Sequence, residues 1–410
     1  MIRRGATPRW YRIAGAAAAL ALVAGACTSD DDDAEPTEEP SEAPADEPSD
    51  EPADEPTEEP ADEPTEEPAD EPTEEPADEP DDTVDVTQGG STLDAVLEAG
   101  VVRCGTRDAL PGFAVLTEGG DHVGFDSDFC RVIAAAVLGD AEAVEHVDVE
   151  TADRFTALQS GEVDVLVRNT TWTASRDGAE GATFLQPNFY DGQGMMVNTG
   201  DFASISEMDG VTVCVAQGTT TEGNAAAEAA RLGLDWEVRA FEDTDLIQES
   251  FIAGQCDGWS SDRSQLTGLR SVYPDGPEAL TILPEVFSKE PLAPAVADGD
   301  TQWAQVVNWA ILATIQAEEF GITSENVDTF AASDDVNIQR FLGLEIEGEE
   351  GAAAVLDPGL GLPTDFAYQI VSQVGNYGEI FERHLAPLGL ERGVNALWTD
   401  GGLMYAPPYR

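Results

Sequence analysis

The chain has 410 residues, of which 82 are acidic and 19 are basic, so its formal net charge at pH 7 is −63. Setting aside 28 acidic residues in the segment 30–82 and four arginines near the N-terminus leaves 54 acidic against 15 basic residues, a net charge of about −39. Such a surface repels phosphate backbones, which argues against nucleic acid as a partner.

Residues 1–27 have the pattern of an export signal. Four arginines precede an apolar run over residues 13–26, which is too short and too rich in alanine for a normal membrane span. Ala24-Gly25-Ala26-Cys27 looks like a lipoprotein processing box, although Ala24 stands where such boxes usually have leucine. We therefore expect lipidation of Cys27 to anchor the protein, extracytoplasmically, to the outer face of the cell membrane. A secretory signal that is simply cleaved is the alternative.

Residues 28–90 are predicted to be a disordered acidic, proline-rich linker. Residues 30–82 contain no lysine or arginine, and proline stands at every fourth position from Pro36 to Pro80. Dense like charge with few apolar residues cannot offset the entropy lost on ordering, and regular proline keeps the chain extended. We interpret this segment as a stalk, because its evenly spread carboxylates favour no cation-binding geometry.

After the stalk, short apolar strands alternate with helical patterns, which predicts an α/β protein. Helices are predicted at residues 92–99, 124–138 and 153–160, and strands at 101–105, 144–149 and 163–167. The order of strands and helices is βαβαβ. A turn follows each strand, and a ligand can bind in such turns.

The pattern then restarts in a second, smaller unit. Strands are predicted at residues 194–197, 211–215, 235–241 and 256–260, with helices from residue 222 and over residues 244–253. An amphipathic helix over residues 301–317 returns the chain to the first unit. We predict one lobe from residues 91–194 and 291–410 and another from residues 195–290, with two crossing segments near 193–197 and 288–296. Ligands of such open sheets collect where strands end, here the cleft between the lobes.

The segment after the predicted strand 163–167 carries the most informative chemistry. Arg168-Asn169-Thr170-Thr171-Trp172-Thr173-Ala174-Ser175-Arg176 brings hydroxyls, an amide and a guanidinium together within nine residues. Arg176 falls near the first turn of a following helix, where backbone N–H groups and the helix dipole favour an anion. An arginine fork binds a carboxylate through two hydrogen bonds. We interpret the segment as a carboxylate clamp; the alternative is an ordinary turn with a surface arginine.

Apart from Cys27, the chain has four cysteines, an even number in an exported protein. Three pairings are possible, and proximity within each predicted lobe favours Cys104–Cys130 and Cys214–Cys256. Free buried thiols are the alternative. There is no Cys-x-x-Cys pair and the three histidines are scattered, so we expect no metal site and no cofactor.

At this point the chain resembles the type II periplasmic solute-binding proteins of ABC transporters, and among them the polar and general L-amino-acid receptors. The matching segments are residues 110–113, 124–128, 155–164, 168–177, 190–197 and 217–221, in the family's order. The resemblance covers most of residues 92–310. It implies a two-lobed fold with two hinge crossings, closure over a small zwitterion, and delivery of the ligand to a permease. We also expect a monomer.

Carried over to this chain, the resemblance assigns Arg176 to the α-carboxylate of the ligand. The hydroxyl and backbone amide of Thr171 would assist, and Asn169 would offer a backbone carbonyl to the ammonium group. Asp262 would be the acidic partner of that ammonium, the alternative being a helix cap or a surface charge.

Further contacts are implied at the edges of the same site. Arg107 and Asp108 lie in the loop after the first strand, where the family contacts the ligand side chain, and Arg168 lies near the cleft; a surface role is the alternative for each of the three. The segment at the mouth of the helix in the second lobe would donate hydrogen bonds to the carboxylate or the side chain of the ligand, through Thr219, Thr220 and Thr221.

Two other classes of function use a similar fold. The chain also resembles cyclohexadienyl and arogenate dehydratases, but no nucleophile and base stand at a telling spacing and no histidine is placed as a partner. We therefore expect no enzyme activity. A sensory or adhesion module on the long stalk could use the same cleft.

Further along the chain, residues 365–384 predict one helix whose apolar stripe belongs to the core.

Overall fold

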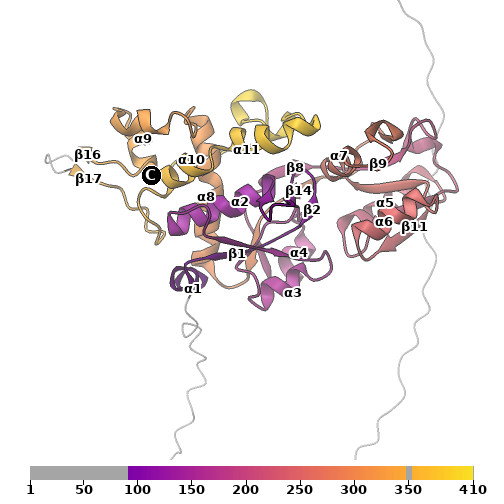
Figure 1. The fold of residues 1–410 in the computed structure, drawn as a ribbon, viewed down its shortest axis with the longest axis horizontal. Coiled ribbons are helices and arrows are strands. Elements are labelled where there is room, and N and C mark those ends of the chain that lie inside the picture. The colour runs from indigo at the N-terminus through magenta and orange to yellow at the C-terminus, as the bar shows by residue number, and fades with distance from the viewer. Residues whose placement is uncertain (1–90, 348–352, 410) are drawn as a thin grey trace, which may run out of the picture. The chain divides into compact units, whose positions relative to one another are not determined.

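The computed structural model describes residues 91–347 and 353–409. The predicted signal, the lipidation site Cys27 and the predicted stalk, residues 28–90, lie outside these residues. Two five-stranded sheets organise the described chain, and each carries its own helices (Figure 1). We call the part built on the first sheet lobe 1 and the part built on the second sheet lobe 2.

The sheet of lobe 1 has the order β5-β1-β6-β15-β7. Its parallel centre pairs β1 with β5 and β6, whereas β15 runs antiparallel to both β6 and β7. The bounds are β1 (Val102–Thr106), β5 (Val144–Asp148), β6 (Val165–Leu166), β7 (Ala182–Phe184) and β15 (Ala295–Ala297). The strand β15 follows lobe 2 in the chain but pairs in the sheet of lobe 1, so lobe 1 is built from two separate stretches of chain.

Helices cover the sheet of lobe 1 on both faces (Figure 1). The helix α2 is buried along almost its whole length, because its residues are apolar or small on every side that meets the sheet and α8. Between β1 and α2 in the chain, the strands β2, β3 and β4 form a small antiparallel sheet. The bounds are α1 (Thr92–Ala99), α2 (Phe125–Leu138), α3 (Arg154–Gln159), α4 (Ala174–Ala179), α8 (Thr301–Glu319), β2 (Ala109–Leu110), β3 (Ala114–Leu116) and β4 (His122–Val123).

The sheet of lobe 2 repeats the arrangement, with the order β11-β10-β12-β9-β13. The strand β10 pairs in parallel with β11 and β12, and β9 runs antiparallel to β12 and β13. The bounds are β9 (Gln193–Asn198), β10 (Thr212–Ala216), β11 (Glu237–Phe241), β12 (Gly258–Asp262), β13 (Leu280–Ile282), α5 (Thr220–Leu232), α6 (Thr244–Ile252), α7 (Arg263–Ser271), and the 3-10 turns Ile205–Glu207 and Pro277–Ala279.

Two short strands carry the chain between the lobes. The strand β8 (Phe189–Asp191) leads into lobe 2, and β14 (Glu290–Leu292) leads back. They pair antiparallel, with Glu290 opposite Asp191 and Leu292 opposite Phe189. The second crossing lies where the sequence predicts it. The first comes a few residues before the predicted segment 193–197, because those residues already belong to β9 of the second sheet.

The predicted single helix over residues 365–384 is wrong, because the chain forms two helices there. Gly375 has a φ of +111°, a backbone conformation that ends α10. Asn376 then begins a new helix by accepting a hydrogen bond from the backbone N–H of Glu379, whose side chain accepts one from Asn376 N–H. The bounds in this region are α9 (Val336–Phe341), β16 (Ile346–Glu347), β17 (Ala353–Ala354), α10 (Phe366–Gln373) and α11 (Tyr377–His384), with 3-10 turns at Val327–Ala332, Ala386–Leu388, Gly393–Asn395 and Trp398–Asp400.

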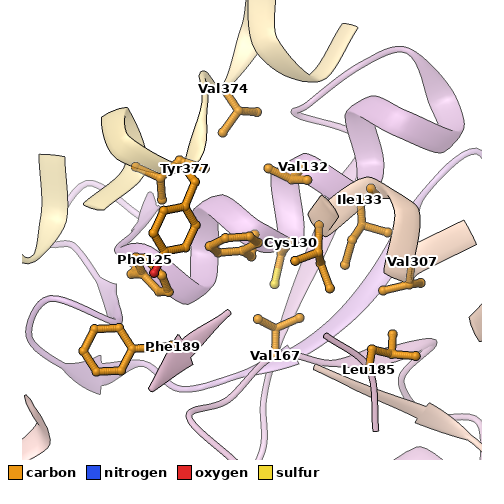
Figure 2. Close-up of a cluster of buried hydrophobic side chains, with 14 of the residues drawn as sticks. Phe125, Cys130, Val132, Ile133, Val167, Leu185, Phe189, Val307, Val374 and Tyr377 are labelled. Carbon is orange, nitrogen blue, oxygen red and sulfur yellow. The ribbon is translucent and has the colours of Figure 1, made fainter. Parts of the chain in front are cut away.

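The apolar stripe predicted on this segment does belong to the core, in spite of the break. Figure 2 shows Tyr377 beside Phe125 and Cys130 of α2, with Phe189 of β8 close by. The Tyr377 ring meets Phe125 edge-on with 6.0 Å between ring centroids, and its hydroxyl donates to the Asn188 carbonyl at 2.9 Å. The C-terminal helices therefore support the start of the first crossing strand.

Two disulfides are present, one in each lobe, in the pairing favoured by the sequence. Cys104 of β1 is joined to Cys130 of α2, and Cys214 of β10 is joined to Cys256 just before β12. Their Cα atoms lie 5.9 and 5.8 Å apart, within the usual range for disulfides. All four cysteines are buried. Each disulfide thus anchors a strand in the parallel part of its sheet, β1 in lobe 1 and β10 in lobe 2, and the binding turns follow those strands.

Within residues 91–347 and 353–409, no helix combines the length and the apolar character that crossing a membrane requires.

We predict that removing the lobe 2 disulfide lowers the stability of the protein. The Cys214–Cys256 bond closes 42 residues, so the double variant C214A/C256A should lose about 3 kcal/mol of free energy of unfolding in urea titrations. Dithiothreitol should destabilise the wild type and should have no effect on a variant in which all four cysteines are alanine. A wild-type transition that does not move on reduction would contradict the prediction.

Candidate functional site

A pocket lies at the ends of the central strands of both lobes and is lined by residues from each. It holds about 420 Å³ of empty space, part of which is open to solvent. Nine of the residues that the sequence predicts as ligand contacts line it. The lobe 1 members are Arg107, Arg168, Asn169, Thr171 and Arg176, and the lobe 2 members are Thr219, Thr220, Thr221 and Asp262.

Arg176 is held in place by its own loop. It lies on α4, and Thr173 caps this helix by accepting a hydrogen bond from the Arg176 N–H at 3.2 Å. Its guanidinium donates to the Thr171 carbonyl at 2.8 Å and to the Gly218 carbonyl of lobe 2 at 3.5 Å. The side chain is only 8% exposed, so the alternative of a surface arginine is wrong. Burial lowers the pKa of Arg176, and the nearby Glu290 and Asp262 carboxylates partly offset this effect.

A second guanidinium beside Arg176 escaped the sequence analysis. Arg154, at the start of α3, is buried and donates to the Thr151 carbonyl at 2.5 Å and to the Gly218 carbonyl at 3.2 Å. Burial lowers its pKa to about 9, and the neighbouring charge of Arg176 adds to the lowering. The signal was present in the sequence, because Arg154 directly precedes the segment 155–164 on which the family resemblance rests.

Arg107 and Arg168 line the same pocket from the ends of two neighbouring strands. Arg168 is buried and is held by lobe 1, since it donates to the Val149 carbonyl at 2.5 Å and to the Thr151 hydroxyl at 2.9 Å. Arg107 instead donates across the cleft to the Thr244 hydroxyl at 3.1 Å. Burial lowers the pKa of both groups. For Arg168 a surface role is therefore wrong.

Asn169 is the one residue other than glycine with a positive φ, +32°, in the described part of the chain. Its backbone N–H donates to the Asp126 carboxylate at 2.9 Å, and its side-chain amide donates to Gln265 of lobe 2 at 3.2 Å. Burial raises the pKa of Asp126 to about 7, although the bond from Asn169 opposes this. Asp126 comes from the segment 124–128, which the sequence analysis selected without giving it a role.

The three threonines at the mouth of α5 have distinct surroundings. The Thr219 hydroxyl donates to the Ala216 carbonyl at 2.6 Å, and the Thr220 hydroxyl donates to the Glu290 carboxylate at 2.9 Å. Thr221 is buried and its backbone carbonyl accepts a hydrogen bond from Gln193 at 3.0 Å. Two of the three hydroxyls predicted to donate to a ligand therefore already donate to protein acceptors.

Asp262 is buried in the pocket from the lobe 2 side. It occupies the N-cap position of α7, but its side chain makes no capping bond there. The residue is 6% exposed, and within the described residues its carboxyl group has no hydrogen-bond or ion-pair partner. Burial raises the pKa of Asp262 well above its usual range, and the nearby carboxylates of Asp191 and Glu290 raise it further. Neither a helix cap nor a surface charge describes this residue.

A second pocket adjoins the first and shares Arg107 and Arg168 with it. It contains about 610 Å³ of empty space, again including open solvent. Its walls are rich in carboxylates from both lobes, with Asp108, Asp148 and Glu150 on one side and Asp243 and Asp245 on the other. Within the described residues, no group of three or more His, Cys, Asp or Glu residues is arranged to hold a metal ion.

The model of the bacterial extracellular solute-binding proteins, family 3, matches residues 102–325. The general L-amino acid-binding periplasmic protein AapJ of Rhizobium johnstonii is 46% identical over 78% of this chain and 93% of its own. The glutamate/glutamine/aspartate/asparagine-binding protein BztA of Rhodobacter capsulatus is 45% identical over 78% and 94%. Among solved structures, an ABC transporter periplasmic binding protein from Brucella ovis with glutathione bound is 42% identical, covers 78% of this chain and 99% of its own, and superposes with a TM-score of 0.74. The chain therefore belongs to family 3 of the bacterial extracellular solute-binding proteins.

Proposed function

We propose that this protein is a receptor that captures an L-amino acid between its lobes and presents it to an ABC permease. One observation carries the proposal: a buried guanidinium from lobe 1, Arg176, and a buried carboxyl from lobe 2, Asp262, which has no hydrogen-bond partner among the described residues, line the same pocket. An amino acid carries the two complementary charges on a single carbon atom. Its carboxylate would bind Arg176 and its ammonium would bind Asp262.

The physical chemistry favours such a ligand over a neutral one. A buried ion without a partner is costly, and each end of a zwitterion loses its hydration when the cleft encloses it. Arg176 offers a fork that binds a carboxylate through two hydrogen bonds, with the Thr171 hydroxyl and amide beside it. Asp262 lacks an internal partner, so an arriving ammonium completes its surroundings. Asn169 would add a backbone carbonyl on the ammonium side.

Closure of the lobes would complete both halves of the site at once. Hydrogen bonds between described residues cross the cleft from Arg107 to Thr244, from Asn169 to Gln265, and from Arg154 and Arg176 to the Gly218 carbonyl, and α7 of lobe 2 also packs against β2 of lobe 1. Weak contacts of this kind leave the balance between open and closed forms to the ligand. The closed form would then be the state that a permease recognises.

The relatives support this class of ligand, because their names specify amino acids or, for the Brucella ovis protein, glutathione. The adjoining pocket offers room for the side chain of the ligand, with Arg107 and Arg168 at its entrance. We extend the proposal to ligands that carry an amino-acid head and a long polar tail, of which glutathione is one. None of these relatives is named as an enzyme, and a dehydratase activity has no support in the site.

The cellular setting forms part of the proposal. We infer an extracytoplasmic monomer, anchored to the outer face of the membrane through a lipid on Cys27 and carried on the acidic stalk. The support is the sequence pattern of residues 1–90 and the periplasmic relatives. A sensory or adhesion role would use the same cleft, and neighbouring permease and ATPase genes would distinguish transport from sensing.

We predict that Arg176→Ala abolishes amino-acid binding, because the ligand carboxylate would then be enclosed without its charged partner. Calorimetry with L-glutamine should show a loss of affinity of about 100-fold or more. The matched control is Arg239→Ala, which removes an exposed arginine paired with Glu237 on lobe 2 and should bind as the wild type does. Unchanged affinity in Arg176→Ala would refute the carboxylate assignment.

We predict that filling the adjoining pocket separates long ligands from short ones. Ala109 is exposed and lines this second pocket only, so Ala109→Trp should occupy the tail space and leave the amino-acid head untouched. In thermal-shift assays, stabilisation by glutathione and L-arginine should fall well below the wild-type value, whereas stabilisation by L-alanine should persist. An equal loss of thermal stabilisation by short and long ligands would show that the ligand tail does not occupy the second pocket.

A further inference from the structure

Two further carboxylates lie on the strands that join the lobes, outside the predicted set of ligand contacts. Asp191 belongs to β8 and Glu290 to β14, and they are register partners in the antiparallel pair. Both influence the Asp262 carboxyl electrostatically. Three acidic groups from three different elements thus converge beside the place where the ligand ammonium is proposed to bind.

Each crossing-strand carboxylate binds the start of a helix that carries part of the site. Glu290 accepts hydrogen bonds from the Thr220 hydroxyl at 2.9 Å and the Asn224 amide at 2.8 Å, both on α5. Asp191 accepts from the backbone N–H of Ser264 at 3.1 Å and from the Ser264 hydroxyl, two residues after Asp262 on α7. The crossing strands therefore hold the N-termini of the two helices that flank the lobe 2 half of the pocket.

Few positive charges are available to balance these three carboxylates. The groups that attract the Asp262 charge are Arg176 on α4 and Arg107 after β1, and in the proposed complex Arg176 is bound to the ligand carboxylate. Lys289 is exposed, and the Arg263 guanidinium donates to the Leu283 carbonyl at 2.6 Å. Keeping all three groups ionised in so small a volume is costly. Burial raises the pKa of Asp191 to about 6, and the bonds from Ser264 and Gly192 only partly oppose this.

We propose that Asp191 and Glu290 are positioning residues of the ammonium site, and that Asp191 and Asp262 share a proton in the empty receptor, which leaves when the ligand ammonium arrives. The O–H bond of one carboxyl group breaks, its proton passes to the buffer, and the ammonium supplies the positive charge in its place. The inference deepens the proposed function and rests on it. Asp262 connects this group of carboxylates to the ligand pocket, because it is 6% exposed, lines the pocket and has no internal partner within the described residues.

The sign of the pH dependence follows from the exchange. The pKa of the cluster is raised in the empty receptor and falls when an ammonium binds, so the complex holds fewer protons than the free protein. Affinity should therefore weaken as the pH falls through the raised pKa of the free protein, by up to about tenfold per pH unit for one proton released. The window therefore lies below the raised pKa values of the free protein and includes pH 6, the value to which the Asp191 pKa is raised; the raised pKa of Asp262 sets its upper end.

The test is calorimetric titration of the whole mature protein with L-glutamine, whose side chain does not ionise in this range. Titrations near pH 6 in buffers of low and high ionisation enthalpy give the number of protons released per ligand bound. We expect up to about one proton released near pH 6, and a smaller number once the pH exceeds the raised pKa values of both Asp191 and Asp262. Binding with no proton release, and with an affinity that does not change with pH, would overturn the inference without touching the proposed function. Failure of any amino acid to bind would instead contradict the proposed function.

Two variants separate positioning through charge from simple structural support. Asp191→Asn and Glu290→Gln keep the size of the side chain and a hydrogen-bond acceptor. Asp191→Asn should release fewer protons and show a flatter pH profile than the wild type. Glu290→Gln should weaken the binding of L-glutamine, because it removes a negative charge beside the ammonium site. Asp298→Asn is the matched control, because Asp298 accepts from the Thr183 hydroxyl at 2.6 Å on the exposed edge of lobe 1. Full wild-type proton release in Asp191→Asn, with affinity lowered equally at every pH, or unchanged affinity in Glu290→Gln, would overturn the proposal.

Discussion

The structure depends on two opposite charges that are buried in separate halves of the molecule. Arg176 is held by lobe 1 and Asp262 by lobe 2, and both line one pocket, where each influences the other's pKa. Burial makes each charge costly unless a partner reaches it. A small zwitterion supplies both partners at once, and it can do so only when the lobes come together. This constraint would couple ligand binding to closure of the lobes, and the closed form is what a transport partner would recognise.

The rest of the fold positions these two groups. Arg176 is aligned by its hydrogen bond to the Thr171 carbonyl, and the Thr171 loop follows a parallel strand whose neighbour is anchored by the Cys104–Cys130 disulfide. Asp262 ends a strand beside β10, which the Cys214–Cys256 disulfide anchors in the same way. Between the lobes run only β8 and β14, and their carboxylates bind the helices on either side of the Asp262 strand end. The two five-stranded sheets therefore support the site, and β8 and β14 join the lobes that carry its two halves.

Much of this arrangement could be predicted from sequence because it is local. The alternation of strands and helices, the two lobes, the disulfide pairing and the nine pocket residues all follow from short patterns and from the family resemblance. Arg154 was missed although it directly precedes the matching segment 155–164, because the residue type alone does not distinguish a buried guanidinium from a surface one. The break at Gly375 was missed because the apolar stripe continues across it with helical spacing. Asp191 and Glu290 are 99 positions apart, so only the pairing of β8 with β14 shows that they meet.

The central claim is that both charged ends of one amino acid are bound, one by each lobe. The most direct measurement compares, by calorimetry, L-glutamine with two analogues, one with the α-carboxylate converted to an amide and one with the α-amino group acetylated. If the account is correct, each analogue leaves one buried protein charge unpaired and loses about 2–5 kcal/mol of binding free energy. An analogue that binds as tightly as L-glutamine would contradict the account, because one of the two buried charges would then have no part in recognition.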